Sequence, residues 1–137
     1  MIVVGKDHIV GPWVVERGGG TWEGCGTTIG IERNGVLVGG VIFDNYNGAN
    51  ICIHSASDGT GRWMNREFLW FVFYYPFVQL GVKRITGPIP SSNFKARKFN
   101  ENLGFELETT LKDAHPEGDL LIYKMTPDKC KWLNLKR

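Results

Sequence analysis

The sequence predicts a single α+β domain whose mixed sheet carries helices on both faces. Residues 27–56 alternate apolar and polar side chains around Asn-Gly dipeptides at positions 34–35 and 47–48, the pattern of three consecutive antiparallel strands. Residues 63–125 then alternate helical and strand patterns, in the order helix, strand, helix, strand, strand. A chain of 137 residues with 42% hydrophobic content fills one core and is too short for two ordinary domains. We therefore expect residues 1–137 to form one domain.

The region before the sheet, residues 1–26, carries the weakest pattern. Ile9, Trp13 and Val14 fall on one side of a short helix, and three glycines at positions 18–20 interrupt it. Because glycine adopts many backbone conformations, we expect a short helix followed by a flexible link.

The strand at residues 49–56 is predicted to lie in the centre of the sheet. Ile51 and Ile53 point to one face, and Cys52 and His54 to the other, so both faces are apolar enough for burial. The other predicted strands span residues 27–33, 36–46, 82–90, 105–114 and 119–125, and a hairpin loop at 115–118 joins the last two.

Two helices are predicted after the first three strands. Residues 63 to about 80 are apolar nearly all round, which predicts the most buried helix, and Pro76 kinks it or ends it early. Residues 93–104 form an amphipathic helix that Asn93 caps and Gly104 closes. Its predicted packed face consists of Phe94, Ala96, Phe99 and Leu103, and its exposed face carries Lys95, Arg97 and Lys98. The amino end of such a helix suits a phosphate-bearing ligand.

Charge and hydropathy indicate neither a nucleic-acid partner nor a membrane span. The net charge is +2, from 16 basic and 14 acidic residues, and no long run of either sign demands a polyanion. The longest apolar run, Phe68 to Phe77, falls well short of the roughly 20 residues that span a bilayer. No charged segment followed by an apolar one opens the sequence, so we expect no secretory leader.

The cysteines and other potential metal ligands are scattered along the chain. Cys25, Cys52 and Cys130 are odd in number and lack a Cys-x-x-Cys spacing, which predicts reduced thiols in a cytoplasmic protein. No group of His, Cys, Asp or Glu residues has the spacing of metal ligands, so we expect no metal.

The helix at residues 93–104 also carries a motif. Asn-x-x-Ala, a cationic turn, an aromatic residue and Asn-Leu-Gly-Phe resemble the last conserved helix and following strand of the GNAT superfamily of N-acetyltransferases. The flanking stretches PFVQLGVKRITGPI and FELETTLKDAHPEGDLLIYKM continue this resemblance, which covers residues 27–126. It is closest to the branch that acetylates the N-terminal amines of ribosomal proteins and to its uncharacterised relatives. The resemblance implies a mostly antiparallel sheet splayed between residues 49–56 and the strand ending at Pro90.

The resemblance also implies a coenzyme A site. In the family, a glycine-containing loop before a helix holds the diphosphate, and the pantetheine arm lies between the splayed strands like an added strand. Two registers of the loop fit: one uses Gly59 and Gly61 with Ala56 at an Arg/Gln position, whereas the preferred one starts at Gly61 and keeps the helix in phase. The alternative is a plain glycine turn that enters a core helix. The implied contacts are Ile53, Ser55, Gly59, Gly61, Arg62, Trp63, Met64, Asn65, Arg66, Asn93, Ala96 and Arg97.

Direct attack of an amine on a thioester needs a neutral amine, a polarised carbonyl and a group that protonates the departing thiolate. The family often places a tyrosine in the motif helix as the acid, and the matching position here is Asn100, so that acid is absent. His54 is the candidate general base because histidine titrates near neutrality. The alternative is a core histidine bonded to a backbone group. Asp44 and Tyr46 are the candidates for binding the acceptor amine.

The predicted function is therefore transfer of an acetyl group from acetyl-CoA to a primary amine, of a peptide N-terminus or a small molecule, within a ternary complex. The alternative is a catalytically weak or inactive GNAT-like binding or assembly module, because the loop motif is degenerate, the tyrosine is absent and residues 1–26 look abbreviated. Residues 127–137 are predicted to form a tail. Exposed strand edges near the last hairpin favour a homodimer.

Overall fold

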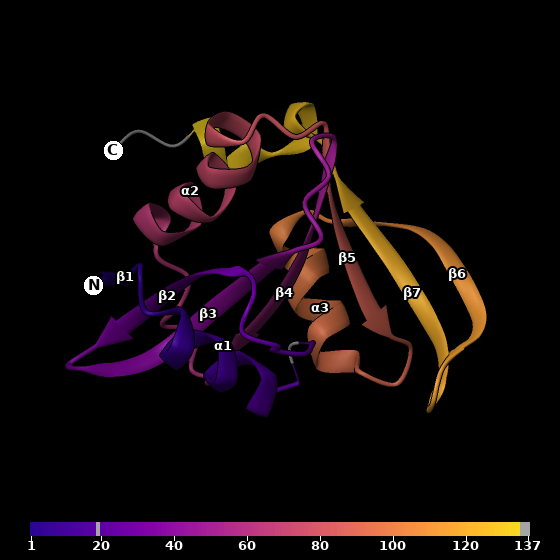
Figure 1. Ribbon diagram of the computed structural model, residues 1–137, viewed down its shortest axis with the longest axis horizontal. Coiled ribbons are helices and arrows are strands. Elements are labelled where there is room, and N and C mark those ends of the chain that lie inside the picture. Colours follow the sequence, from indigo (N-terminus) through magenta and orange to yellow (C-terminus); the bar gives the residue numbers. More distant parts are fainter. Residues whose placement is uncertain (19, 135–137) are drawn as a thin grey trace.

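The computed structural model describes residues 1–18 and 20–134. Within this part of the chain, seven strands form one sheet in the order β1-β2-β3-β4-β5-β7-β6 (Figure 1). The strands are β1 (Ile2–Val3), β2 (Thr27–Arg33), β3 (Val36–Asp44), β4 (Asn50–Ser57), β5 (Arg84–Pro90), β6 (Glu106–His115) and β7 (Gly118–Met125). The helices are α1 (Asp7–Glu16), α2 (Arg66–Tyr74) and α3 (Phe94–Leu103), with a π-helical turn η1 (Tyr75–Gln79) and 3-10 turns η2 (Pro127–Lys129) and η3 (Lys131–Asn134). The predicted α+β fold is confirmed.

β4 occupies the centre of the sheet, as predicted, with antiparallel β3 on one side and parallel β5 on the other. The β2–β3 hairpin turns at Asn34 and Gly35, whose φ angles of 54° and 79° are the left-handed values that an Asn-Gly turn supplies. After β3, the Asn47 side chain accepts hydrogen bonds from the amides of Ala49 and Asn50, which turns the chain into β4.

The helices cover both faces of the sheet. Ile51 and Ile53 of β4 belong to the main core with residues of α2 and α3, whereas Ala56 belongs to a smaller cluster with Val10 and Val14 of α1. Because neighbouring residues of a strand point to opposite faces, α1 lies on the face opposite to α2 and α3. In Figure 1, α1 crosses in front of β2, β3 and β4.

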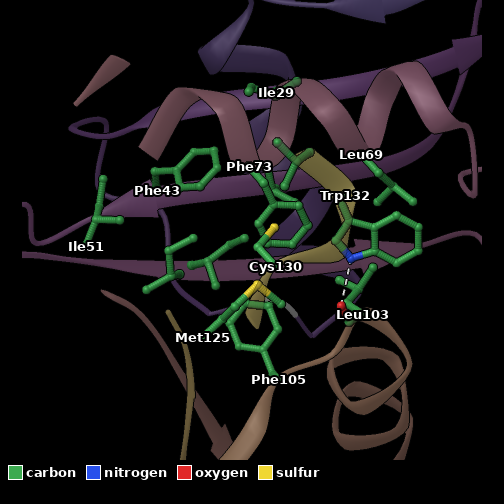
Figure 2. Close-up of a cluster of buried hydrophobic side chains, with 14 of the residues drawn as sticks. Ile29, Phe43, Ile51, Leu69, Phe73, Leu103, Phe105, Met125, Cys130 and Trp132 are labelled. Atoms are coloured by element: carbon green, nitrogen blue, oxygen red, sulfur yellow. Dashed lines mark hydrogen bonds between the residues drawn. The ribbon is translucent and has the colours of Figure 1, made fainter. Parts of the chain in front are cut away.

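The main core lies between the sheet, α2 and α3, and the segment after β7 closes it (Figure 2). Cys130 and Trp132 are buried there, and the Trp132 Nε1–H donates to the Leu103 carbonyl over 2.7 Å. Part of the predicted tail is therefore core structure. Its last residues, 135–137, lie outside the described residues.

α1 confirms the predicted short helix and two positions of its packed face, because Val14 is buried and Trp13 packs against the same cluster, whereas Ile9 was wrongly predicted. Val10 and Val14 are fully buried, whereas Ile9 is 50% exposed. Residues four apart lie on one helix face, so Val10 pairs with Val14 and Ile9 is turned away. Gly40 of β3 lies under them: a Cβ there would lie 2.9 Å from a Val14 methyl group.

The second predicted helix begins later than expected, and among the three α-helices of the described residues it has the most buried positions, as predicted. Asn65 caps α2 by accepting the Phe68 amide, so residues 63–64 lie outside the helix. The α-helix ends at Tyr74 and the chain continues as the π-helical turn, which contains Pro76. Only one face of α2 is buried, because its opposite side is not covered by the sheet.

α3 has the predicted cap at Asn93 and the left-handed Gly104, but one position of its packed face was wrongly predicted. Phe94 is 71% exposed, and Asn100 is 3% exposed. At 100° per residue, position 94 lies about 200° from position 96, whereas position 100 continues the stripe of 96, 99 and 103. The angular position of a residue on the helix, rather than the polarity of its side chain, therefore decides which of Phe94 and Asn100 is buried.

Candidate active site

The main feature of the sheet is a gap between β4 and β5. The two strands pair at Asn50–Arg84, Ile51–Ile85 and Cys52–Thr86, and within the described residues no pairing between them follows. Pro88 and Pro90 bring no amide hydrogen to the later part of β5. The β4 backbone beyond Cys52 is thus left open along one edge, as in sheets that accept an added strand.

Two adjoining cavities fill and extend this gap. The larger has a volume of about 700 Å³ and is lined by residues of the loop after α1, of β4, β5 and α3, and of the β6–β7 turn. The smaller has a volume of about 280 Å³ and reaches the loop after β4 and Lys95. Both cavities are lined by Gly18, Ser55, Asn93 and Ala96, so together they form one continuous cleft through the sheet.

A histidine–carboxylate pair lies beside the larger cavity. His54 Nε2 lies 3.1 Å from Asp44 Oδ1, and the two side chains are only 14% and 22% exposed. An ionised carboxylate accepts hydrogen bonds but donates none, so this contact selects the neutral tautomer that donates from Nε2 and leaves a lone pair on Nδ1 over the opposite neutral tautomer. The partner of His54 is therefore a carboxylate, not the backbone group of the alternative interpretation.

The loop after α1 closes over the His54 ring. A Cβ at Gly20 would lie 2.6 Å from His54 Nδ1, so only glycine fits at this position, where φ is also +87°. Asn93 joins the same loop to α3, because its Nδ2 donates to the Gly18 carbonyl while its Oδ1 caps Ala96.

The opposite face of the gap carries a second polar pair. The Ser55 hydroxyl donates to Asn100 Oδ1 over 3.4 Å, and both residues line the larger cavity. Ser55 and His54 are neighbours on β4 and so point to opposite faces. The gap is thus flanked by His54 on the α1 face and by Asn100 on the α3 face.

The loop between β4 and α2 is bonded largely to itself. Asp58 accepts from the Thr60 amide and hydroxyl, and the Arg62 guanidinium binds Asp58 Oδ2 over 3.2 Å. The hydrogen bonds from Thr60 hold the pKa of the Asp58 carboxyl below its usual range. Among the described residues, the amides of Gly61 and Trp63 have no hydrogen-bond acceptor.

Trp63 belongs to the core rather than to the surface of this loop. It is 7% exposed and stacks on Phe99 of α3, with ring centroids 4.1 Å apart. Lys95 faces the loop from α3, since its Nζ lies 4.0 Å from the point that a Cβ on Gly59 would occupy. The smaller cavity is thus flanked by the Lys95 ammonium and the Asp58 carboxylate.

The structure brings together some of the predicted site residues and separates others. Ile53, His54, Ser55, Asn93 and Ala96 line the cleft. Asp44 lines neither cavity but contacts His54, which does. Tyr46 is 51% exposed and lies outside both cavities. The residues predicted to bind the cofactor that line neither cavity are Gly59, Gly61, Arg62, Trp63, Met64, Asn65, Arg66 and Arg97.

Arg97 and Asn65 have local roles in the described structure. Arg97 Nη1 donates to the Ser91 carbonyl, and its guanidinium lies over the exposed Phe94 ring. Asn65 caps α2.

Sequence reasoning missed Gly20, Asp58, Lys95 and Asn100 as site residues. Lys95 and Asn100 carried a signal, because each lies in the motif helix, and helix phase places Asn100 on the packed side. Gly20 and Asp58 carried none, since their roles depend on contacts with segments far along the chain.

Residues 1–18 and 20–134 contain no group of three or more His, Cys, Asp or Glu side chains placed to hold a metal ion. None of the helices in these ranges is long and apolar enough to cross a membrane.

No protein-family model matches the sequence, and no curated protein matches it. Solved structures do match. Mutant forms of the spermidine/spermine N-acetyltransferase SpeG from Vibrio cholerae align over 98% of this chain and 97% of theirs, with 15% identity and a TM-score of 0.70. An acetyltransferase of the GNAT family from Bacillus anthracis aligns over 74% of this chain and 66% of its own, with 19% identity and a TM-score of 0.59.

The N-acetyltransferase PseH from Campylobacter jejuni, solved in complex with acetyl coenzyme A, aligns over 77% of this chain and 70% of its own, with 14% identity and a TM-score of 0.57. The chain spans only 63% of a probable acetyltransferase that it also matches, with 21% identity. At these identities the likeness is one of fold. The chain has the fold of the GNAT acetyltransferases.

Proposed function

We propose that this chain is an acetyl-CoA-dependent N-acetyltransferase that transfers the acetyl group directly to a primary amine in a ternary complex. The observation that carries the proposal is the cleft through the sheet, which passes between β4 and β5 and has the His54–Asp44 pair on one side. The same cleft would serve the cosubstrate at one end and the acceptor at the other.

The pantetheine arm would lie along the open edge of β4 beyond Cys52. Its amide groups would bond the backbone around Ile53 and Ser55, in the manner of an added strand. The diphosphate would lie in the smaller cavity, where the Lys95 ammonium offers a positive partner. The amides of Gly61 and Trp63 have no acceptor but line neither cavity, so they would bind the diphosphate only if it extended beyond the cavity into the loop after β4. Arg62 would add a contact if its bond to Asp58 were exchanged for one to a phosphate.

His54 would act as the general base. With Nε2–H bonded to Asp44, Nδ1 accepts the proton of the attacking amine, and the amine nitrogen bonds to the thioester carbonyl carbon. The carbon–sulfur bond then breaks and the electron pair leaves with sulfur. Asp44 would act by holding the ring and stabilising the imidazolium, which differs from the acceptor-binding role predicted from sequence.

The acceptor would enter between the loop after α1 and the β6–β7 turn, where Thr21, His115 and Glu117 line the larger cavity. We propose a peptide N-terminus or a small amine as the acceptor, in keeping with the resemblance to the ribosomal-protein branch. The structural neighbours include an enzyme named for spermidine and spermine, so polyamines belong in the panel of acceptors.

Two further expectations belong to this proposal. β6 is an edge strand whose residues are almost all exposed, with Leu107 50% and Leu111 44% exposed, which favours pairing of two copies along this edge.

Cys25, Cys52 and Cys130 are free thiols, which supports a cytoplasmic setting.

Calorimetric titration with acetyl-CoA tests whether the protein binds the cosubstrate, and no binding at millimolar ligand would refute the proposal.

Acetyl transfer is tested by incubating the protein with acetyl-CoA and a panel of amines, peptides and polyamines, with release of free thiol measured against buffer. Thiol release above the buffer rate supports the transferase.

A binding module without turnover is the second candidate. It is favoured by Asp58, an ionised carboxylate that lines the cavity where a diphosphate would lie, and by the bonds that hold Arg62 within its own loop. Tight binding of acetyl-CoA without thiol release by any acceptor would support the module.

A further inference from the structure

We propose that Asn100 is a catalytic residue that stabilises the departing thiolate of coenzyme A through its side-chain N–H groups. The proposal rests on the proposed transferase function and extends it. It gives the departing sulfur a hydrogen-bond partner on α3, on the face of the gap opposite to His54.

The first observation is a buried donor without an acceptor. Asn100 is 3% exposed, and the one hydrogen bond of its side chain among the described residues uses Oδ1, which accepts from Ser55. Its Nδ2 therefore keeps two N–H donors. Every fully enclosed side-chain nitrogen or oxygen of the described residues has a partner, so Nδ2, which has none, keeps some accessible surface, and Asn100 is a lining residue of the larger cavity.

The second observation is the location of this donor. A Cβ at Gly87 would lie 2.9 Å from Asn100 Nδ2, so the carboxamide lies directly over Gly87. Gly87 is the first β5 residue beyond the segment paired with β4. Asn100 thus sits where the two strands part, on the α3 face, while His54 lies on the α1 face of the same gap. A thioester held there has the base on one side and the amide on the other.

The departing thiolate needs a hydrogen-bond donor such as a side-chain amide more than it needs an acid. The amine nitrogen bonds to the carbonyl carbon, its proton passes to His54 Nδ1, and the carbon–sulfur bond breaks with both electrons remaining on sulfur. A thiol ionises only about one to two pH units above neutrality, so the thiolate is a stable leaving group that needs hydrogen bonds rather than immediate protonation. Two N–H donors in a site shielded from water provide them. Solvent protonates the thiolate after release.

Ser55 is a positioning residue in this arrangement. Its hydroxyl donates to Oδ1, and this contact orients the carboxamide with Nδ2 over Gly87. Gly87 has a related role, because any larger side chain would displace the amide.

The test compares Asn100→Leu and Asn100→Asp with the wild type. Both variants keep the approximate volume of the side chain, and the aspartate replaces the two donors by a negative charge. We expect kcat for thiol release to fall on the order of 100-fold to 1000-fold in either variant, with the Kd for acetyl-CoA little changed. Ser55→Ala is expected to lower kcat by a smaller factor.

The second readout does not depend on turnover. Free coenzyme A is titrated by calorimetry at pH values below and above ionisation of its thiol. The wild type is expected to bind it more tightly as the thiolate forms, whereas Asn100→Leu shows no such gain and Asn100→Asp binds the thiolate more weakly than the thiol. A merely structural role of Asn100 would leave this pH dependence unchanged.

The outcomes separate the two proposals. A wild type that binds neither acetyl-CoA nor coenzyme A overturns the transferase and this inference together. A wild type that turns over, with folded Asn100 variants of equal kcat and equal pH dependence, overturns only the role of Asn100. A variant that raises the Kd for acetyl-CoA without changing kcat also overturns it, because Asn100 would then bind the pantetheine arm rather than the sulfur.

Discussion

The two ends of the cleft differ in how they use their polar groups. At the gap between β4 and β5, the β4 backbone groups beyond Cys52 that face β5 and the Asn100 side-chain Nδ2 have no partner in the described structure. In the loop between β4 and α2, Asp58, Thr60 and Arg62 bond one another. Groups left without partners in a folded chain are costly, so they mark a place for a ligand. The self-bonded loop indicates instead a turn that holds its own shape.

The largest effect is expected at the gap. His54→Ala should lower kcat for thiol release by roughly 100-fold to 10,000-fold, the usual range for a general base. Asp44→Asn should lower it less, because the ring stays in place without the carboxylate charge. Steady-state release of free thiol at saturating acetyl-CoA measures both.

His8→Ala is the control, since His8 is an exposed histidine of α1 that lines neither cavity. An equal loss in His8→Ala and His54→Ala would remove the special role of the His54–Asp44 pair.

The next effect concerns the loop that covers His54. Gly20→Ala should lower kcat/KM by roughly 10-fold to 100-fold, because the new methyl group would displace the imidazole and a small misplacement of a catalytic group is costly. Gly24→Ala has the same left-handed backbone strain, with φ +82° against +87°, but no atom lies near its Cβ. Similar kinetics for the two alanine variants would show that strain, not contact with His54, matters.

A smaller effect is expected at the loop end. Asp58→Asn should tighten acetyl-CoA binding by about 3-fold to 5-fold and Lys95→Ala should weaken it by a similar factor, in line with partly exposed charge pairs. Calorimetry at two salt concentrations measures both changes. Lys98→Ala is the control, because Lys98 lies on α3 but lines neither cavity. Unchanged affinity in Asp58→Asn and Lys95→Ala would place the diphosphate elsewhere.

The strands were predictable and the site only in part. Alternating side chains and the Asn34-Gly35 turn are local signals, so β2 and β3 were predicted with nearly correct ends. The place where β4 leaves β5 depends on pairing between distant segments. Sequence reasoning named His54 and Asp44 but not their contact, and it placed Phe94 on the packed side of α3 where helix phase puts Asn100.

The smallest effect concerns stability away from the cleft. Hydrogen bonds from Arg84, together with the charges of Arg84 and Lys124, lower the pKa of Glu108. A carboxyl whose pKa is lower in the folded state stabilises the fold above its unfolded pKa, and this contribution is lost as the pH falls through the folded value. Glu108→Gln should therefore unfold with a shallower loss of stability on acidification below about pH 5.

Urea unfolding at a series of pH values measures this dependence. Glu106→Gln on the same strand is the control, because Glu106 forms no ion pair among the described residues. Equal acid dependence in the wild type and Glu108→Gln would mean that the pair is open in solution.

Amide hydrogen exchange with and without coenzyme A tests the central claim most directly, because it reports whether the ligand adds to the open edge of β4. We predict that those amides of residues 53–57 that face β5 exchange at least tenfold more slowly when coenzyme A is bound, as expected for newly bonded backbone groups, whereas the amides that face β3 and those of β6 are unchanged. Bound coenzyme A that leaves the β4 amides unprotected would contradict the account.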